Sequence, residues 1–193
     1  MTTTNNPGQP AKEVGKDGPT HSYRLLLILA LIIFALDQVT KAWIFHNLPL
    51  DSYFPPDSIE VIEGFFYIVH IGNEGAAWGM FSGYSSLLAI FALVALVFIY
   101  KCRHSLELHR KSMQVAFGLL SGGIVGNLVD RLLHGHVIDF LDFHFPFTIP
   151  YVMPTGRYPS FNVADAVIVV GVIVYIILSF SLSKTETDAA AEK

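Results

Sequence analysis

The chain is poor in cysteine and in charged residues. Cys102 is its one cysteine, and only 15% of its 193 residues are charged. A single cysteine excludes a disulfide framework within the chain. The formal net charge of −4, from 16 acidic and 12 basic residues, argues against a nucleic-acid partner. What remains is strongly apolar, with 52% hydrophobic residues.

Four apolar stretches approach the roughly 20 residues that a helix needs to cross a bilayer. They are Tyr23–Phe45, Ser85–Tyr100, Met113–Leu133 and Phe161–Ser183. The first does not read as a cleavable signal peptide, because a polar tail precedes it and Asp37-Gln38 stands where small residues are expected. The sequence therefore predicts a mainly α membrane protein, a bundle of four transmembrane helices.

Lys and Arg are unevenly distributed between the loops. Residues 47–83 contain none and residues 134–160 contain only Arg157, whereas Lys101, Arg103, Arg110 and Lys111 join the second and third stretches. The positive-inside rule then places both termini in the cytoplasm. Residues 1–20 are expected to be a disordered cytoplasmic tail, residues 21–183 the membrane domain, and residues 184–193 a short cytoplasmic tail.

Both outer loops carry structural signals. Residues 59–71 are rich in β-branched and aromatic residues, which predicts one or two strands of a small sheet within residues 47–83, at the membrane surface. In the second loop we expect a short interfacial helix over Val137–Phe143. Beyond it, Pro146, Pro150, Pro154 and Pro159 prevent a long helix. An irregular, aromatic-rich cover is expected there.

Polar residues recur at one depth in the expected bundle. Asp37 lies about 20 Å and Asn127 about 21 Å from the cytoplasmic ends of their helices, at 1.5 Å per residue. We therefore expect one polar layer near the outer leaflet, within reach of Asp139 and composed of Asp37, Lys41, Asn127, Asp130, Arg131, Asn162 and Asp165. Ionisable groups at membrane depth cost at least about 2.5–3.5 kcal/mol each, so such a layer indicates function.

Small residues accompany this layer. Gly118, Gly122 and Gly126 recur at every fourth position, which favours close helix packing. For Gly122, close passage of an extended substrate backbone is an alternative. In the first outer loop, Asn73 and Gly75 combine an amide with small neighbours and suit backbone recognition.

Two close carboxylates can hydrolyse a peptide bond, because repulsion makes one keep a proton while the other activates water. The candidates are Asp37, Asp130, Asp139, Asp142 and Asp165. Asp165 begins a helix, whose positive end stabilises a carboxylate. Geometry favours Asp139 with Asp165 modestly over Asp37 with Asp165. Asp130 neighbours Arg131 and is expected to have a fixed structural partner.

Two other functions compete with peptide hydrolysis. A metal-dependent hydrolase could use a compact set of ligand types, namely His134, His136, Asp139, Asp142 and His144. A proton-coupled carrier could use the intramembrane polar groups. The inner halves of the spans are nearly uncharged, however, so a path through the membrane is missing.

Five segments in order resemble the lipoprotein signal peptidases (signal peptidase II) of bacteria. They are residues 37–41 (DQVTK), 73–78 (NEGAAW), 122–131 (GGIVGNLVDR), 135–140 (GHVIDF) and 161–165 (FNVAD). The resemblance covers about residues 23–183. It implies a four-helix inner-membrane aspartyl peptidase with its site facing the periplasm and a small β-cradle in the first outer loop. Its implied substrates are prolipoproteins, cut before a diacylglyceryl-modified cysteine.

The resemblance also implies roles for residues. It makes Asp139 and Asp165 the catalytic pair, with a supporting and substrate-binding set of Asp37, Lys41, Asn73, Gly75, Gly122, Asn127, Arg131 and Asn162, to which we add Asp130. No cofactor or metal is implied, membrane lipids are partners, and sensitivity to globomycin-like inhibitors is expected. Two features depart from the family pattern: residues 144–160 look longer and richer in proline than usual, and Glu74 is acidic.

Overall fold

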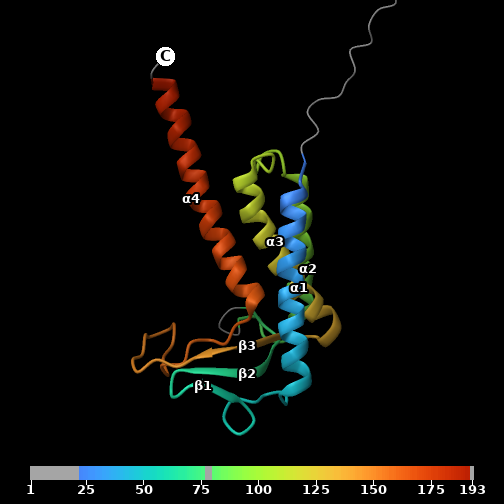
Figure 1. Ribbon diagram of the computed structural model, residues 1–193, viewed down its shortest axis with the longest axis vertical. Helices are drawn as coiled ribbons and strands as arrows, with labels where there is room; N and C mark the ends of the chain where they lie inside the picture. The colour runs from blue at the N-terminus through green and yellow to red at the C-terminus, as the bar shows by residue number, and fades with distance from the viewer. Residues whose placement is uncertain (1–21, 77–79, 192–193) are drawn as a thin grey trace, which may run out of the picture.

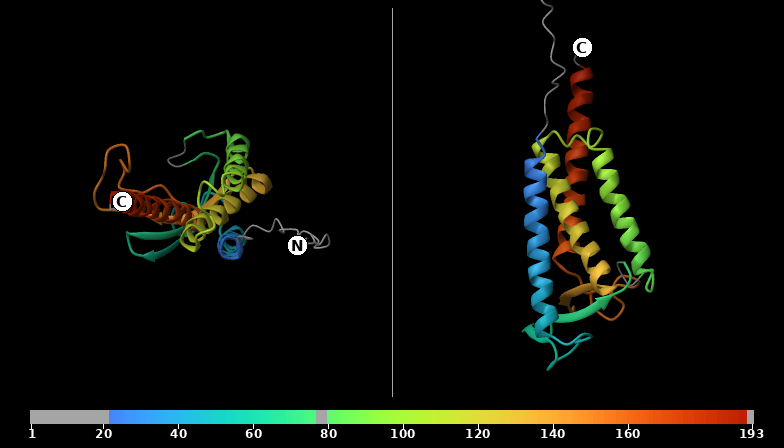
Figure 2. Two further views of the ribbon diagram at one scale, coloured as in Figure 1. Left: turned by 90° about the horizontal axis from the view of Figure 1, so that it is seen from above. Right: turned by 90° about the vertical axis from the view of Figure 1, so that its right-hand side faces the viewer.

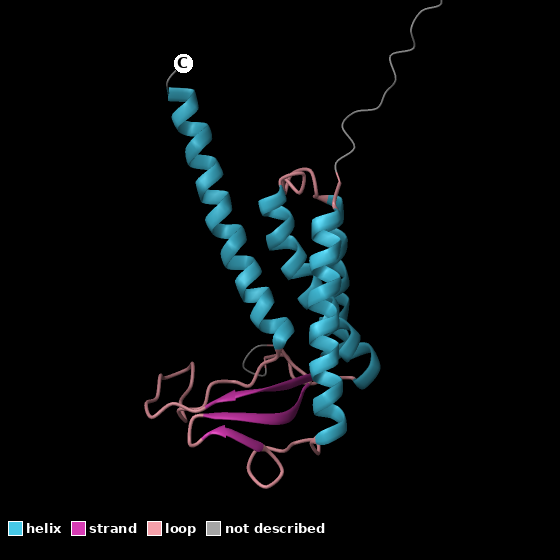
Figure 3. Ribbon diagram, viewed as in Figure 1, coloured by secondary structure: helices cyan, strands magenta, loops and turns pink. Residues whose placement is uncertain are grey.

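The computed structural model describes residues 22–76 and 80–191, with side chains described up to residue 182. The expected N-terminal tail and Trp78 lie outside the described residues. The described parts contain the helices α1 (Arg24–Asn47), α2 (Ser85–Lys101), α3 (Lys111–His134) and α4 (Val163–Ala191). They also contain the strands β1 (Ile59–Ile62), β2 (Phe66–Asn73) and β3 (Val137–Phe143). The helices rise from one side of the sheet that these strands form (Figures 1 and 3).

Helix α3 is the centre of the bundle. It packs against α1, α2 and α4, and in the view along the helices it lies between them (Figure 2). In its most apolar 18 residues 67% are buried, against 11% in the corresponding windows of α1 and α4. The outward faces of α1 and α4 are therefore apolar and exposed, which is what a lipid-facing helix requires.

The glycines of α3 explain how closely its neighbours approach. A Cβ on Gly122 would lie 2.8 Å from the Ala30 carbonyl oxygen of α1, and one on Gly123 would lie 2.6 Å from the Ala164 carbonyl oxygen of α4. Only glycine leaves room for backbone contact on both sides. Gly122 therefore serves the close packing of α3 against α1.

The sheet is antiparallel, with strand order β1-β2-β3. Strands in the first loop were expected, but the helix expected over Val137–Phe143 is wrong: this segment is β3, paired with β2 through Phe66 opposite Phe143 and Ile71 opposite Asp139. Strand β2 would otherwise expose unpaired N–H and C=O groups at its edge. Gly135, with φ 78°, ends α3 and turns the chain toward that edge.

In the part of the chain that the structure describes, three helices are long and apolar enough to cross a membrane: Arg24–Asn47, Lys111–His134 and Val163–Leu182. Helix α2 is apolar but shorter, with 17 residues. A mainly helical membrane protein with a small sheet is thus confirmed. A fourth span and the orientation of the bundle stay predictions.

Candidate active site

A buried ion cluster joins α1 to α3. Lys41 Nζ lies 2.8 Å from Asp37 Oδ2 and 2.8 Å from Asp130 Oδ2, and each of the three side chains is at most 2% exposed. Gln38 completes the cluster by donating to Asp130 Oδ1 at 3.1 Å and to Asp37 Oδ2 at 3.2 Å. These ion pairs stabilise the contact between α1 and α3, because an unpaired charge at this depth would be very costly.

The two carboxylates of this cluster each hold a main-chain N–H from another element. Asp130 Oδ2 accepts from the N–H of Ile138 at 3.1 Å, and Asp37 Oδ1 accepts from the N–H of Ala164 at 3.0 Å. These residues directly precede Asp139 and Asp165 in the chain. The ion cluster therefore fixes the backbone beside both candidate catalytic aspartates.

Three asparagines bind the two aspartates, and Asn127 connects them to Lys41 of the ion cluster. Asn162 Nδ2 donates to Asp139 Oδ1 at 2.8 Å, and Asn73 Nδ2 donates to Asp139 Oδ2 at 2.9 Å. Asn127 Nδ2 donates to Asp165 Oδ1 at 2.7 Å, while its Oδ1 accepts from Lys41 Nζ at 2.9 Å. Each carboxyl group thus has a fixed orientation.

The first turn of α4 positions Asp165. The Asp165 N–H donates to Asn162 Oδ1 at 2.9 Å, and the Asn162 N–H donates to Asp165 Oδ2 at 3.2 Å. This reciprocal pair is the capping arrangement that satisfies free N–H groups at a helix start. The helix dipole also favours a negative charge there.

The two aspartates differ in environment. Asp139 is 2% exposed, and this burial, together with the negative charge of Asp165, raises the pKa of its carboxyl from an ordinary 3.8 to about 8. Asp165 is only partly buried and has the helix terminus beside it. Burial and the neighbouring carboxylate therefore favour the protonated form of Asp139.

Arg131 ties the first loop to α3. Its Nη2 donates to the Gly75 carbonyl oxygen at 2.8 Å and its Nη1 to the Asn127 carbonyl oxygen at 3.3 Å. The Gly75 N–H in turn donates to Asn73 Oδ1 at 2.9 Å. These contacts fix the position of the Asn73 side chain, whose amide donates to Asp139.

A cavity of about 950 Å³ opens onto these groups. Six of the residues singled out from the sequence line it: Asn73, Gly75, Asn127, Arg131, Asp139 and Asp165. Four others are not among the lining residues: Lys41 and Asn162 bond to residues of that set, and Asp37 and Asp130 pair with Lys41. Gly122 lies apart from the cavity, against α1.

Sequence reasoning missed part of the wall. Arg157 lines the cavity, with its Nε donating to Asp142 Oδ1 at 2.8 Å and its guanidinium 5.0 Å from the centre of the Tyr53 ring. Asp142 also lies 2.9 Å from His144 Nε2 and accepts from Ser160 Oγ at 3.3 Å. The available signal for Arg157 was that it is the one Lys or Arg within residues 134–160.

The metal-ligand cluster considered from the sequence does not assemble. Within residues 22–76 and 80–191, no group of three or more His, Cys, Asp or Glu side chains is placed to hold a metal ion. Asp139 is held by two amides, and His144 contacts Asp142. The arrangement instead places the carboxyl groups of Asp139 and Asp165 beside an open cavity, which suits acid–base hydrolysis.

Comparison with known proteins also indicates a peptidase. Residues 29–181 match the model of a family described as signal peptidase (SPase) II. A lipoprotein signal peptidase of Desulforapulum autotrophicum is 38% identical over 159 residues, covering 78% of this chain and 88% of that protein. One from Nostoc punctiforme is 36% identical over 165 residues, covering 85% of this chain and 94% of that protein.

A solved structure of a bacterial membrane enzyme has a similar fold. The structure of a bacterial membrane enzyme, obtained by the in meso method at 2.3 Å, superposes with a TM-score of 0.64 at 33% identity, covering 83% of this chain and 90% of that one. The family match and the three long apolar helices together indicate a multi-pass membrane protein. The chain belongs to the signal peptidase II family of peptidases.

Proposed function

We propose that this chain is an aspartyl endopeptidase that removes signal peptides from prolipoproteins, cutting before a diacylglyceryl-modified cysteine. One observation carries the proposal: Asp139 and Asp165 both border the cavity and are both bound to Asn162. Asn162 thus binds both carboxyl groups, that of Asp139 through its side-chain amide and that of Asp165 through its main-chain N–H. Two carboxyl groups, one to remove a proton from water and one to protonate the carbonyl oxygen, are what water-mediated peptide hydrolysis needs.

In the proposed reaction, ionised Asp165 removes a proton from water, and the water oxygen attacks the scissile carbonyl carbon. Asp139 gives its proton to the carbonyl oxygen, which forms a tetrahedral intermediate. The intermediate collapses as the C–N bond breaks, and the leaving nitrogen takes the proton that Asp165 had gained. The carbonyl re-forms and returns a proton to Asp139, so one water is consumed and both carboxyl groups are restored.

The cavity supports a lipid-modified substrate. Its wall includes Val152 from the second loop and Ile168 and Val169 from α4, beside the polar groups of the dyad. At about 950 Å³ it is near the upper end of the roughly 300–1,000 Å³ typical of ligand sites. An apolar wall next to the aspartates suits a diacylglyceryl group, and cyclic peptide inhibitors of the globomycin type are expected to compete for the same space.

We further propose four membrane spans with both termini in the cytoplasm and the site at the periplasmic face of the inner membrane. The 17 residues of α2 span about 25 Å at 1.5 Å per residue, close to the hydrocarbon thickness of a thin bilayer. The basic loop between α2 and α3 supports this orientation.

A gel-shift cleavage assay in detergent tests the function. The substrate is a prolipoprotein prepared with and without its diacylglyceryl group, and the enzymes are wild type, Asp139→Asn and the control Asp57→Asn, whose side chain is exposed. We expect cleavage of the lipidated form alone by wild type and the control, and none by Asp139→Asn. Failure of folded wild type to cut a verified lipidated substrate would overturn the proposal.

A further inference from the structure

The second loop contains a closed hairpin over residues 145–156. Its base is joined by a bond from the Phe145 N–H to the Gly156 carbonyl oxygen at 2.8 Å, and its tip by one from the Met153 N–H to the Ile149 carbonyl oxygen at 2.8 Å. Gly156 has φ 79°, and a Cβ there would lie 2.6 Å from the Phe145 carbonyl oxygen. The base therefore requires glycine, and the hairpin is a built element with its own backbone hydrogen bonds.

The hairpin presents apolar side chains outward. Tyr151 stands at the tip with φ 66° and is 98% exposed, while Phe147 is 53% and Ile149 42% exposed. Met153, by contrast, is 4% exposed and anchors the hairpin inward. A left-handed tyrosine carries backbone strain, and here the strain accompanies full exposure of an aromatic ring.

No charged residue occurs between His144 and Arg157. Both of these residues contact Asp142 at the foot of the hairpin, so the charges stay at the base while the projecting part is neutral. A solvent-exposed loop of this length ordinarily carries polar side chains, and contiguous exposed apolar groups mark an interaction surface.

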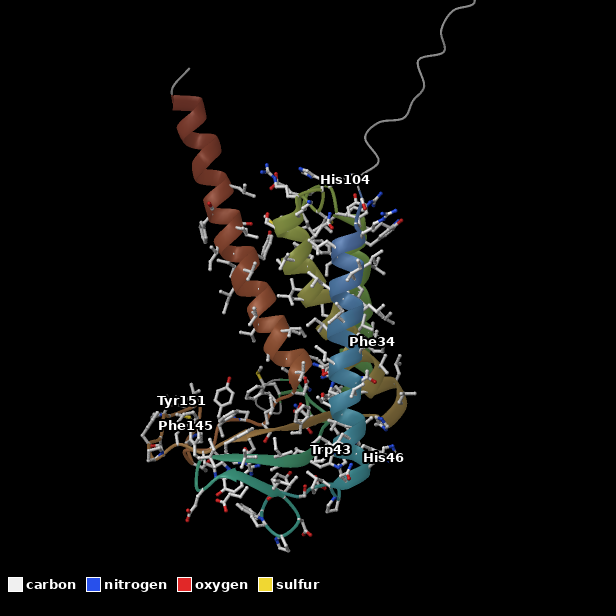
Figure 4. The ribbon with its side chains drawn as sticks, viewed as in Figure 1. Phe34, Trp43, His46, His104, Phe145 and Tyr151 are labelled. Atoms are coloured by element: carbon white, nitrogen blue, oxygen red, sulfur yellow. The ribbon has the colours of Figure 1, made fainter. Side chains whose placement is uncertain are left out.

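The position of the hairpin indicates which partner covers it. The hairpin lies at the end of the sheet farthest from α1, and Tyr151 lies on the side of the sheet from which the helices rise (Figures 1 and 4). Val152 of the hairpin and Val169 of α4 line the same cavity. Val169, Val172 and Ile173 are 58%, 41% and 51% exposed on α4, so the tip continues the lipid-facing surface of that helix.

We propose that the hairpin 145–156 inserts its tip into the bilayer leaflet on the sheet side, so that Phe147, Ile149 and Tyr151 contact lipid. Aromatic side chains are enriched at this depth, where the ring is apolar and the hydroxyl reaches headgroups. Its internal hydrogen bonds satisfy backbone groups that lipid cannot. The mouth of the cavity then opens beside acyl chains, which lets a lipid-anchored molecule enter sideways.

Spin-label accessibility in liposomes tests this insertion without reference to activity. Cys102 is replaced by serine, and single cysteines at Tyr151 or Phe147 carry a nitroxide. Leu31→Cys, on the exposed face of α1, serves as the membrane reference, and Glu63→Cys, beyond β1, as the aqueous reference. Collision rates are measured with oxygen, which enriches in hydrocarbon, and with a water-soluble nickel chelate.

We expect the oxygen-to-nickel ratio at positions 151 and 147 to exceed that at position 63 by about threefold or more, toward the value at position 31. A ratio at both positions within error of position 63 would overturn the insertion. Each labelled protein is first checked for an unchanged unfolding temperature. Because the Tyr151 side chain is almost fully exposed, its replacement removes little packing.

Discussion

Replacing Lys41 by methionine tests the buried ion cluster. Methionine keeps much of the side-chain volume but removes the ammonium that lies 2.8 Å from both Asp37 and Asp130. Those carboxylates are 0% and 2% exposed, so water cannot take the place of the ammonium. Breaking a buried ion pair in this way costs about 3–5 kcal/mol. For a chain of this size that corresponds to a fall of about 6–20 °C in unfolding temperature.

The assay is thermal unfolding of purified protein in detergent. Glu107→Gln is the matched control, because it breaks a partly exposed pair, Arg110 with Glu107 at 3.2 Å, which is worth about 1 kcal/mol or less. Adding Asp130→Asn to Lys41→Met should recover part of the loss, since fewer unpaired charges remain buried. An unfolding temperature for Lys41→Met within about 2 °C of wild type would refute the reasoning.

Three further predictions follow from the site. Cleavage should fall about tenfold per pH unit above pH 8, because Asp139 must keep its proton and its pKa is raised to about 8; a rate that stays level to pH 10 would contradict this. Gly126→Ala should destabilise the fold by about 1–3 kcal/mol in thermal unfolding, because its Cβ would overlap the Asp37 carboxylate. Arg157→Gln should raise KM about tenfold with kcat nearly kept, because Arg157 lines the cavity and is held in place by Asp142 rather than by Asp139 or Asp165. A loss confined to kcat would contradict this substrate-binding role.

Apolar length and strand composition predicted most of the fold. The three long helices and the strands of the first loop were readable because hydrophobic runs and β-branched runs are local signals. Val137–Phe143 was misread because it becomes a strand only by pairing with the edge of β2, which lies far away in the chain. Pairing of this kind is a tertiary effect that local sequence does not contain.

The polar layer was predictable from depth along the helices, and the structure brings these residues into contact. The contacts themselves were not predictable. Nothing local indicates that Asp130 and Asp37 hold the N–H groups of Ile138 and Ala164, or that Gln38 lies between the two carboxylates. The packing role of Gly122 was not predictable either, because which face of α3 meets α1 depends on how the helices associate.

The most direct test of the catalytic pair is the single-turnover rate of Asp139→Asn and Asp165→Asn on a diacylglyceryl-modified prolipoprotein. Each substitution keeps the shape of the side chain and removes one acid–base group, so each rate should fall by about 10³-fold or more. Unfolding temperatures near that of wild type would show that the ion cluster of Asp37, Lys41 and Asp130 is intact. Turnover at the wild-type rate by either folded variant would contradict the assignment of Asp139 and Asp165 as the catalytic pair.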